Sequence, residues 1–405
     1  MIDAERLLRD LEEMGRIGAT PGGGVCRLAA SREDGAARDW FVARLREEGL
    51  KVSVDAVGNI YGVAELADPA APLVLTGSHL DSQPTGGRYD GAYGVLASLE
   101  ALRAVRRNAA GSKPRCNLGV VDWTNEEGAR FAPSTLGSAV YAGLVPVPFA
   151  QSRQDGAGVT LGQALEGIGY LGKDEPPRNV AAYVELHIEQ GPELERAGRT
   201  IGVVEGNWGT AKYVATIRGR AAHTGPTPMR ERRDALLPAA QLVLFCRRLS
   251  DDTGGALLSS VGRLDVMPNS SNVVAGEARL FAEFRAVDPA MLSAACGQLE
   301  AKARELSTAT VPIELVRTLD RPAGAFDPGL RDLIERTAGE CGFASMRLHT
   351  IAGHDAVPMR SACPSAMIFV PSAGGVSHHE SEFTQPDDLV AGARALAATL
   401  ARLVE

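Results

Sequence analysis

The chain has 405 residues, which exceeds a single compact core and suits two domains of ordinary size. Apolar residues make up 45% of it and charged residues 23%, the balance of a soluble globular protein. The formal net charge of −8 provides no basic excess to neutralise phosphates, so we expect neither a nucleic acid nor a membrane as a partner.

The N-terminal segment and the cysteines indicate the compartment. Residues 1–14 read as an amphipathic helix that lacks the basic start and the apolar core of a signal peptide. The sequence has no run of about 18 apolar residues, the length that a membrane span needs. The six cysteines lie far apart and form no Cys-x-x-Cys pair. This spacing favours a reducing compartment, and we predict a cytoplasmic protein.

Strand-like and helix-like patterns alternate along the first half of the chain. Apolar strand-like runs occupy residues 59–66, 72–78, 117–124 and 181–187. A helical pattern at 91–105 separates two of these runs, and a strand at 366–372 with a helix at 387–405 resumes the alternation. This order predicts an α/β fold, in which a largely parallel central sheet carries helices on both faces.

Residues 208–322 follow a different order, β-α-β-β-α-β, which is that of a split βαβ sandwich. The predicted elements are a strand at 210–219, a helix at 235–249, strands at 256–267 and 271–287, a helix at 288–306 and a strand at 310–318. We therefore predict a catalytic domain formed by residues 1–207 and 323–405, interrupted by an inserted α+β domain at 208–322.

Side chains of the kind that bind metals follow four separate predicted strands. They are His79, the pair Glu126 and Glu127, His187, and the pair His378 and His379. In an open parallel sheet, the carboxyl ends of the strands form the edge where ligands bind. A single histidine after an apolar strand is more often a satisfied core residue. Four such groups in matching positions instead indicate one site.

The residues around these four groups indicate a pair of cations. Asp90 lies eleven positions after His79 in a glycine-rich loop, where it can both cap a helix and bridge two metals. Asp81 is a candidate to orient His79. Glu126 and Glu127 repel each other, so one of them can bind metal while the other accepts a proton from water. Mixed histidine and carboxylate donors favour Zn²⁺, Mn²⁺, Co²⁺ or Ni²⁺ over Mg²⁺ or Ca²⁺.

Seven segments between residues 77 and 382 resemble, in the same order, a known family. They read GSHLDSQPTGGRYDG, WTNEEGARF, ELHIEQGP, AAHTGPTPMRERRDA, NSSNVVAGE, AGHDA and MIFVPSAGGVSHHESE. The family is the hydantoinase/carbamoylase branch of the dinuclear-metal aminoacylase and carboxypeptidase-like amidohydrolases. This branch includes N-carbamoyl-L-amino-acid hydrolases, allantoate amidohydrolases and β-ureidopropionases.

The resemblance implies a role for each matching residue. The implied metal ligands are His79, Asp90 as the bridge, Glu127, His187 and His378. Glu126 is the implied general base. The implied substrate contacts are Gln190, His223, Asn272, Arg285 and Gly353.

For two of these substrate contacts, His223 and Arg285, the resemblance implies a specific role. His223 matches the histidine that binds the reacting carbonyl, often from the partner subunit of a dimer. Arg285 would pair with the substrate carboxylate, and closure of the inserted domain would bring it together with His223. The sequence departs from the family at Ile351, where a glycine is usual, and at Glu283, where an aspartate is common.

The implied reaction is hydrolysis of the ureido C–N bond of an N-carbamoyl amino acid or a related ureido acid, which releases ammonia and carbon dioxide. The resemblance further implies two divalent metal ions, with Zn²⁺ as the first candidate. It also implies a homodimer formed through the inserted lid domain. Allantoate is an alternative substrate. An aminoacylase or dipeptidase on the same metal centre, and a catalytically silent binding protein on the same fold, are the alternative functions.

Overall fold

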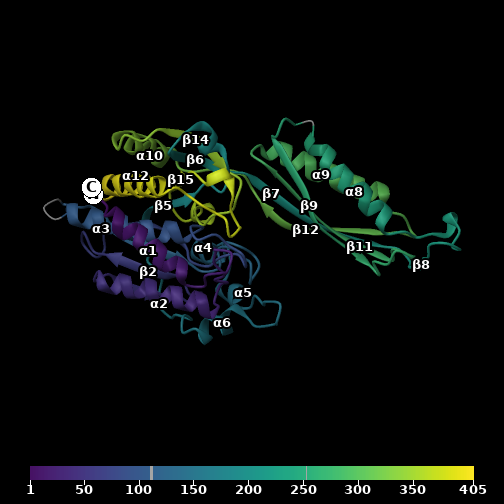
Figure 1. Cartoon of the computed structure of the whole chain (residues 1–405), viewed down its shortest axis with the longest axis horizontal. Coiled ribbons are helices and arrows are strands. Elements are labelled where there is room, and N and C mark those ends of the chain that lie inside the picture. The colour runs from purple at the N-terminus through teal and green to yellow at the C-terminus, as the bar shows by residue number, and fades with distance from the viewer. Residues whose placement is uncertain (110–112, 252) are drawn as a thin grey trace. The chain divides into compact units, whose positions relative to one another are not determined.

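The computed structural model describes residues 1–109, 113–251 and 253–405, and the chain divides into two compact units (Figure 1). The large unit contains residues 1–205 and 326–405, and the inserted unit contains residues 206–325. None of the helices in the described part of the chain combines the length and hydropathy that crossing a lipid bilayer requires. All six cysteines are free thiols.

A mixed sheet runs through the large unit in the order β1-β2-β4-β3-β5-β15-β6, with β14 beside β6. Its central strands β4, β3, β5 and β15 are parallel, and the strands at the flanks pair antiparallel. The strands are β1 (Lys51–Val54), β2 (Ile60–Ala64), β3 (Leu73–His79), β4 (Asn117–Trp123), β5 (Val180–Ile188), β6 (Ile201–Asn207), β14 (Ser345–Thr350) and β15 (Ser365–Val370). The short β13 (Gly324–Ala325) pairs with the last residues of β6.

The central strands are buried on both faces, as the continuous apolar runs predict. Every residue of β3, β4 and β15 is buried. Because successive side chains point to opposite faces, β15 divides its residues between two cores. Ile368 belongs to the core under the long helices, whereas Met367 and Phe369 belong to the core on the other face.

Helices cover both faces of this sheet, which confirms the predicted fold class. The long helices are α1 (Ala4–Arg16), α2 (Arg32–Glu47), α3 (Ala92–Ala109), α10 (Pro328–Glu340) and α12 (Pro386–Val404). The short helices are α4 (Leu136–Tyr141), α5 (Val147–Gln151), α6 (Leu161–Gly167), α7 (Glu193–Ala197), α11 (Ala356–Met359) and the 3₁₀ turn η2 (Ala373–Gly375). Helices α3 and α12 pack against each other and against the central strands, whereas α11 packs against α4, β5 and β15.

An aromatic cluster ties three of the central strands together on the face away from α3. The indole N–H of Trp123 in β4 donates a hydrogen bond to the Tyr183 hydroxyl in β5, at 3.0 Å. That hydroxyl donates in turn to the Gly77 carbonyl in β3, at 2.9 Å. Tyr61 and Tyr141 meet the Trp123 ring at centroid distances of 5.9 and 5.3 Å.

The inserted unit is an antiparallel sheet in the order β12-β7-β11-β9, with two helices packed against it. Its elements are β7 (Gly209–Arg218), β8 (Ala222–His223), the 3₁₀ turn η1 (Met229–Glu231), α8 (Leu236–Asp251), β9 (Leu257–Met267), β10 (Val273–Val274), β11 (Glu277–Ala286), α9 (Pro289–Leu306) and β12 (Ile313–Arg321). This is the predicted β-α-β-β-α-β order with one difference. The single strand expected at 271–287 is broken at Gly276, whose N–H bonds to the Met267 carbonyl while β10 leaves to pair with β8.

A buried ion network lies in the large unit between α2 and the ends of β3 and β4. Arg38 is fully buried, and its guanidinium is 2.8 Å from the Asp34 carboxylate and 3.9 Å from that of Asp122. It also donates to the Gly58 carbonyl at 2.6 Å. A buried charge of this kind is tolerated only because its partners are present.

We expect Arg38→Met to destabilise the protein by about 3–5 kcal/mol, because it leaves two buried carboxylates without their cation. Urea unfolding measures the effect. The matched control on the same helix is Arg32→Met: the Arg32 side chain is 94% exposed beside Glu33. A surface pair of this kind contributes about 0–1 kcal/mol. Equal unfolding midpoints for the two variants would contradict the role given to the network.

Candidate metal centre

The four predicted groups of donor side chains meet at one edge of the large unit. His79 is the last residue of β3, Glu126 and Glu127 follow β4, and His187 is the next-to-last residue of β5. His378 lies in the loop between β15 and α12. Because β4, β3, β5 and β15 are parallel neighbours, their carboxyl ends lie side by side.

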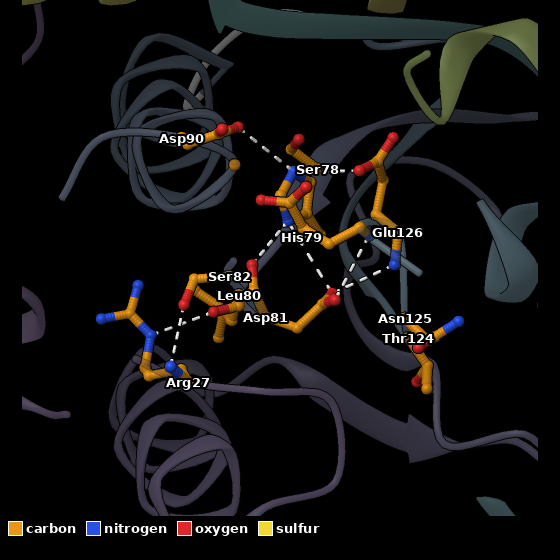
Figure 2. Close-up of polar contacts among 12 residues, drawn as sticks. Arg27, Ser78, His79, Leu80, Asp81, Ser82, Asp90, Thr124, Asn125 and Glu126 are labelled. Atoms are coloured by element: carbon orange, nitrogen blue, oxygen red, sulfur yellow. Dashed lines mark hydrogen bonds and ion pairs between the residues drawn. The ribbon is translucent and has the colours of Figure 1, made fainter. Parts of the chain in front are cut away.

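Asp90, at the start of α3, meets two of these histidines with one carboxylate oxygen. Its Oδ1 is 3.2 Å from His187 Nε2 and 3.6 Å from His79 Nε2. The approach is close because residue 91 is a glycine: a Cβ there would lie 2.4 Å from the His79 ring, and its φ is +63°. Figure 2 shows Asp90 and Glu126 both directed at His79 Nε2, from two different directions.

The second oxygen of Asp90 faces a different set of donors. Asp90 Oδ2 is 3.4 Å from His378 Nε2, which is also 3.4 Å from Glu127 Oε2. Asp90 thus belongs to two groups of three donors, and within each group the donor atoms lie within 4.8 Å of one another. Asp90 is common to both groups. A carboxylate shared in this way is the arrangement that a pair of adjacent cations requires.

Backbone carbonyls fix the orientation of the two buried imidazole rings. His79 Nδ1 lies 2.9 Å from the Asp81 carbonyl, and His187 Nδ1 lies 2.8 Å from the Ile188 carbonyl. A carbonyl can only accept, so each Nδ1 carries a proton and each Nε2 is the ring atom that faces the cluster.

Two further carboxylates hold the backbone of the donor loops. Asp81 accepts the N–H groups of Glu126 and Glu127 at 3.1 and 3.3 Å (Figure 2). Glu382 accepts the N–H groups of Tyr89 and Asp90, both at 3.1 Å. From the sequence, Asp81 was expected only to orient His79. In the structure it also supports the glutamate pair.

The electrostatics of the cluster fit divalent cations. Burial and the surrounding carboxylates hold the pKa values of Glu126 and Glu127 well above the ordinary range. Burial lowers the pKa of His79 to about 4, so its ring stays neutral, the form that binds metals. Among the described residues, the buried Glu127 Oε1 has no hydrogen-bond partner. Positive charge at this position would relieve the crowding of carboxylates, so the donor set fits a dinuclear metal site.

Gln190 lies beside the cluster and contacts Asp90. Its backbone is left-handed, with φ of +59°, and its side-chain N–H group donates to Asp90 Oδ2 at 2.9 Å and to Ser377 at 3.1 Å. The Gln190 Oε1 atom is buried and has no hydrogen-bond partner in the described part of the chain. The contact with Asp90 was not expected from the sequence.

The segment around Gly353 lies behind His187. The ring of His354 packs edge-on against the His187 ring, and the two ring centroids are 4.5 Å apart. Glu185 anchors this segment: its carboxylate accepts the Ala356 N–H at 2.7 Å and the Ser78 hydroxyl at 2.8 Å. Sequence reasoning missed Glu185, although it lies two positions before His187 and so shares its face of the strand.

The remaining predicted residues lie in the inserted unit, at opposite ends of its sheet. His223 in β8 pairs with Val273, next to Asn272. Arg285, near the other end of β11, pairs with Thr210 and donates to Glu283 at 2.6 Å. From Arg285 to the first residue of β11 the strand extends about 27 Å, and β8 lies beyond that end (Figure 1). Within one chain, therefore, Arg285 and His223 lie far apart.

An open α/β sheet that gathers histidines and carboxylates at the ends of its parallel strands defines a class, the metal-dependent hydrolases. Within that class, the chain belongs to peptidase family M20/M25/M40, whose family model matches residues 75–402.

Individual relatives resemble nearly the whole chain. The N-carbamoyl-L-amino-acid amidohydrolase of Rhizobium meliloti is 38% identical, covering 98% of this chain and 95% of that protein. The allantoate amidohydrolase of Bacillus subtilis is 32% identical, covering 97% of this chain and 96% of that protein. The crystal structure of an amidase of the hydantoinase/carbamoylase family from Burkholderia vietnamiensis matches with a TM-score of 0.90 and 41% identity, covering 100% and 98% of the two chains. The family resemblance of the seven segments is thereby confirmed.

We expect Asp81→Asn to weaken binding of divalent metal by about 10–100-fold, the usual effect of losing an outer support of metal ligands. The amide keeps the shape of the side chain but replaces one of the two acceptor oxygens that hold the Glu126 and Glu127 N–H groups with a donor. Competition with a chelator measures the affinity. The control is Asp68→Asn, which alters a carboxylate in the loop before β3. Unchanged affinity in Asp81→Asn would contradict this support.

Proposed function

We propose that the protein is a two-metal amidohydrolase, which cleaves the ureido C–N bond of an N-carbamoyl amino acid or a related ureido acid. The products are ammonia, carbon dioxide and the amino compound. One observation carries the proposal: Asp90 is shared by two donor groups, and Glu126 lies beside them without belonging to either. The Rhizobium meliloti relative, an N-carbamoyl-L-amino-acid amidohydrolase, supports the substrate class.

The proposed metal ligands are His79, Asp90, Glu127, His187 and His378, with Asp90 as the bridge. Zn²⁺ is the first candidate, because neutral imidazoles and carboxylates suit it, and Mn²⁺, Co²⁺ and Ni²⁺ share this preference. Bound at this position, the metals would polarise the ureido carbonyl and lower the pKa of the attacking water.

Glu126 is the proposed general base. Its Oε2 lies 3.6 Å from His79 Nε2, and its backbone N–H is held by Asp81. The side chain is almost completely buried, so it exchanges protons with the reactants rather than with bulk solvent. In the proposed reaction, Glu126 removes a proton from the attacking water and delivers it to the leaving nitrogen.

The substrate contacts are proposed to come from both units. Arg285 would bind the substrate carboxylate through its guanidinium, with the backbone at Gly353 contributing to the same end. His223 and Asn272 would stabilise the negative charge that develops on the carbonyl oxygen. The free acceptor atom of Gln190 is available to a substrate N–H.

The positions of Arg285 and His223 support a homodimer. Since the two lie at opposite ends of the sheet of the inserted unit, we propose that each active site takes Arg285 from its own chain and His223 with Asn272 from the partner. The inserted unit offers a surface for this assembly. Strand β9 is at the edge of the sheet, and the neighbouring α8 exposes Leu237 and Leu244 by 61% and 58%. An open strand edge beside apolar side chains is a surface that a second copy can cover.

Ammonia release across a panel of acids tests the function. We expect chelator-treated protein to be inactive and to recover with Zn²⁺, Mn²⁺, Co²⁺ or Ni²⁺ on at least one of three substrate types: N-carbamoyl amino acids, ureidopropionate and allantoate. Allantoate is the second candidate substrate because the Bacillus subtilis relative is named for it. Glu126→Gln should lower kcat by about 10²–10⁴-fold while metal content stays unchanged. Cleavage of dipeptides or N-acyl amino acids without ammonia release would instead support a peptidase.

Complementation between two inactive variants tests the shared site. Arg285→Ala and His223→Ala should each abolish turnover as homodimers. When the two chains are coexpressed, half of the dimers pair them, and one of their two sites has both residues, so about a quarter of wild-type activity should return. The control is coexpression of Arg285→Ala with the double variant Arg285→Ala/His223→Ala, in which no site is complete. Failure of the mixed dimers to recover activity would exclude this arrangement.

A further inference from the structure

Residues 17–27, which we call the glycine hairpin, fold back on themselves near the proposed metal centre. Ala19 and Val25 form a β-bridge. Within the turn, the Thr20 N–H donates to the Gly24 carbonyl and the Gly23 N–H to the Thr20 carbonyl, both at 3.0 Å. The proposed function assigns no role to this segment.

One side of the glycine hairpin is fastened to the loop that leads from His79 to Asp90. Val25 and Gly86 exchange backbone hydrogen bonds at 2.9 and 3.0 Å. The buried Arg27 donates from Nε to the Leu80 carbonyl at 3.0 Å, and its backbone N–H donates to the Ser82 hydroxyl at 2.8 Å (Figure 2). This side of the hairpin therefore moves with the loop that carries Asp90.

The other side closes around Glu380. The Thr20 hydroxyl donates to Glu380 Oε1. A Cβ on Gly22 would lie 2.1 Å from Glu380 Oε2, and one on Gly24 would lie 2.8 Å from Glu380 Cα. Neither glycine has a positive φ. Glycine is therefore required at these positions because a side chain would lack space, not because of the backbone conformation. A side chain at Gly22 would therefore have to displace the Glu380 carboxylate, whereas one at Gly24 would collide with backbone atoms of Gly86 and Glu380.

Glu380 belongs to the loop that carries His378. It lies two residues after His378, in a turn closed by the Glu382 N–H and the His379 carbonyl at 3.0 Å. His378 itself has a left-handed backbone with φ of +54°, and its side chain is 51% exposed. A non-glycine residue holds this conformation only where the surroundings impose it. His79 and His187, in contrast, are buried within regular strands.

We propose that the glycine hairpin positions His378, with Thr20 and Gly22 as positioning residues for one of the two metals. The inference rests on the proposed metal centre. The affected donor group is Asp90 Oδ2, Glu127 and His378. The group formed by Asp90 Oδ1, His79 and His187 does not depend on the contact between Thr20 and Glu380. The two metal sites therefore differ in what holds them: one is built into the sheet and the other depends on the contact between Thr20 and Glu380.

Metal binding by four variants separates this role from a general effect on the fold. Thr20→Val removes the hydroxyl but keeps the shape of the side chain, and Gly22→Ala displaces the Glu380 carboxylate. Thr20→Ser restores the donor. Gly23→Ala is the matched control, because its φ of +91° strains an alanine while a Cβ there would have no atom within 4 Å. Metal-depleted protein is dialysed against chelator-buffered Zn²⁺, and the bound Zn²⁺ per chain is measured.

We expect the wild-type protein to bind two Zn²⁺ ions. In Thr20→Val and Gly22→Ala the first should bind as in wild type, while the second should bind about tenfold or more weakly, within the range for outer supports of metal ligands. The metal concentration for half-maximal activity should rise by the same factor, with kcat restored at saturating Zn²⁺. Thr20→Ser and Gly23→Ala should match wild type within about twofold.

Two outcomes would overturn the inference. Only the second would also contradict the proposed metal centre. If wild type binds two ions and both steps weaken together in the variants, or neither weakens, the hairpin does not position His378 and the proposed function is untouched. If wild type binds fewer than two ions, the proposed metal centre is wrong, and the inference is wrong with it.

Discussion

The sharing of Asp90 between two sets of donors is the constraint on which the large unit depends. The carboxylate can serve both sets only if each oxygen keeps its own direction. Glu382 holds its backbone N–H, Gln190 donates to Oδ2, and Gly91 allows the His79 ring to approach Oδ1. Glu382 and Gln190 come from segments distant in the sequence, so the fold converges on one side chain of four heavy atoms.

Gathering acids at this edge has an electrostatic cost, because burial and mutual repulsion both oppose their ionisation. Two fully buried arginines lie behind the cluster. Arg38 pairs with Asp34, and Arg27 donates to backbone carbonyls close to His79. Their positive charge offsets part of the repulsion, and cations at the donor groups would offset more. Stability and metal binding would thereby be coupled, because the arginines and bound metals would relieve the same repulsion.

The sequence indicates most of the sheet and the residues at its edge, because both follow from short-range patterns. Continuous apolar runs identify β3, β4 and β15, and the histidines and glutamates directly after such strands can only meet at their common edge. The contacts that arrange these residues are long-range and leave no such pattern. Gln190 reaching Asp90 and Glu380 reaching Thr20 depend on how loops pack. The separation of Arg285 from His223 depends on strand register, and a list of motifs carries no information about register.

The hydrogen-bonded chain from Trp123 through Tyr183 to Gly77 links β4, β5 and β3 just below the residues that would hold the metals. The indole is buried and only a few residues from Glu126, and the chain contains just two other tryptophans. Its environment is set by the same strand ends that carry the donors. The molecule thus contains an internal optical reporter, so changes at the catalytic edge can be followed by light emission without attaching a label.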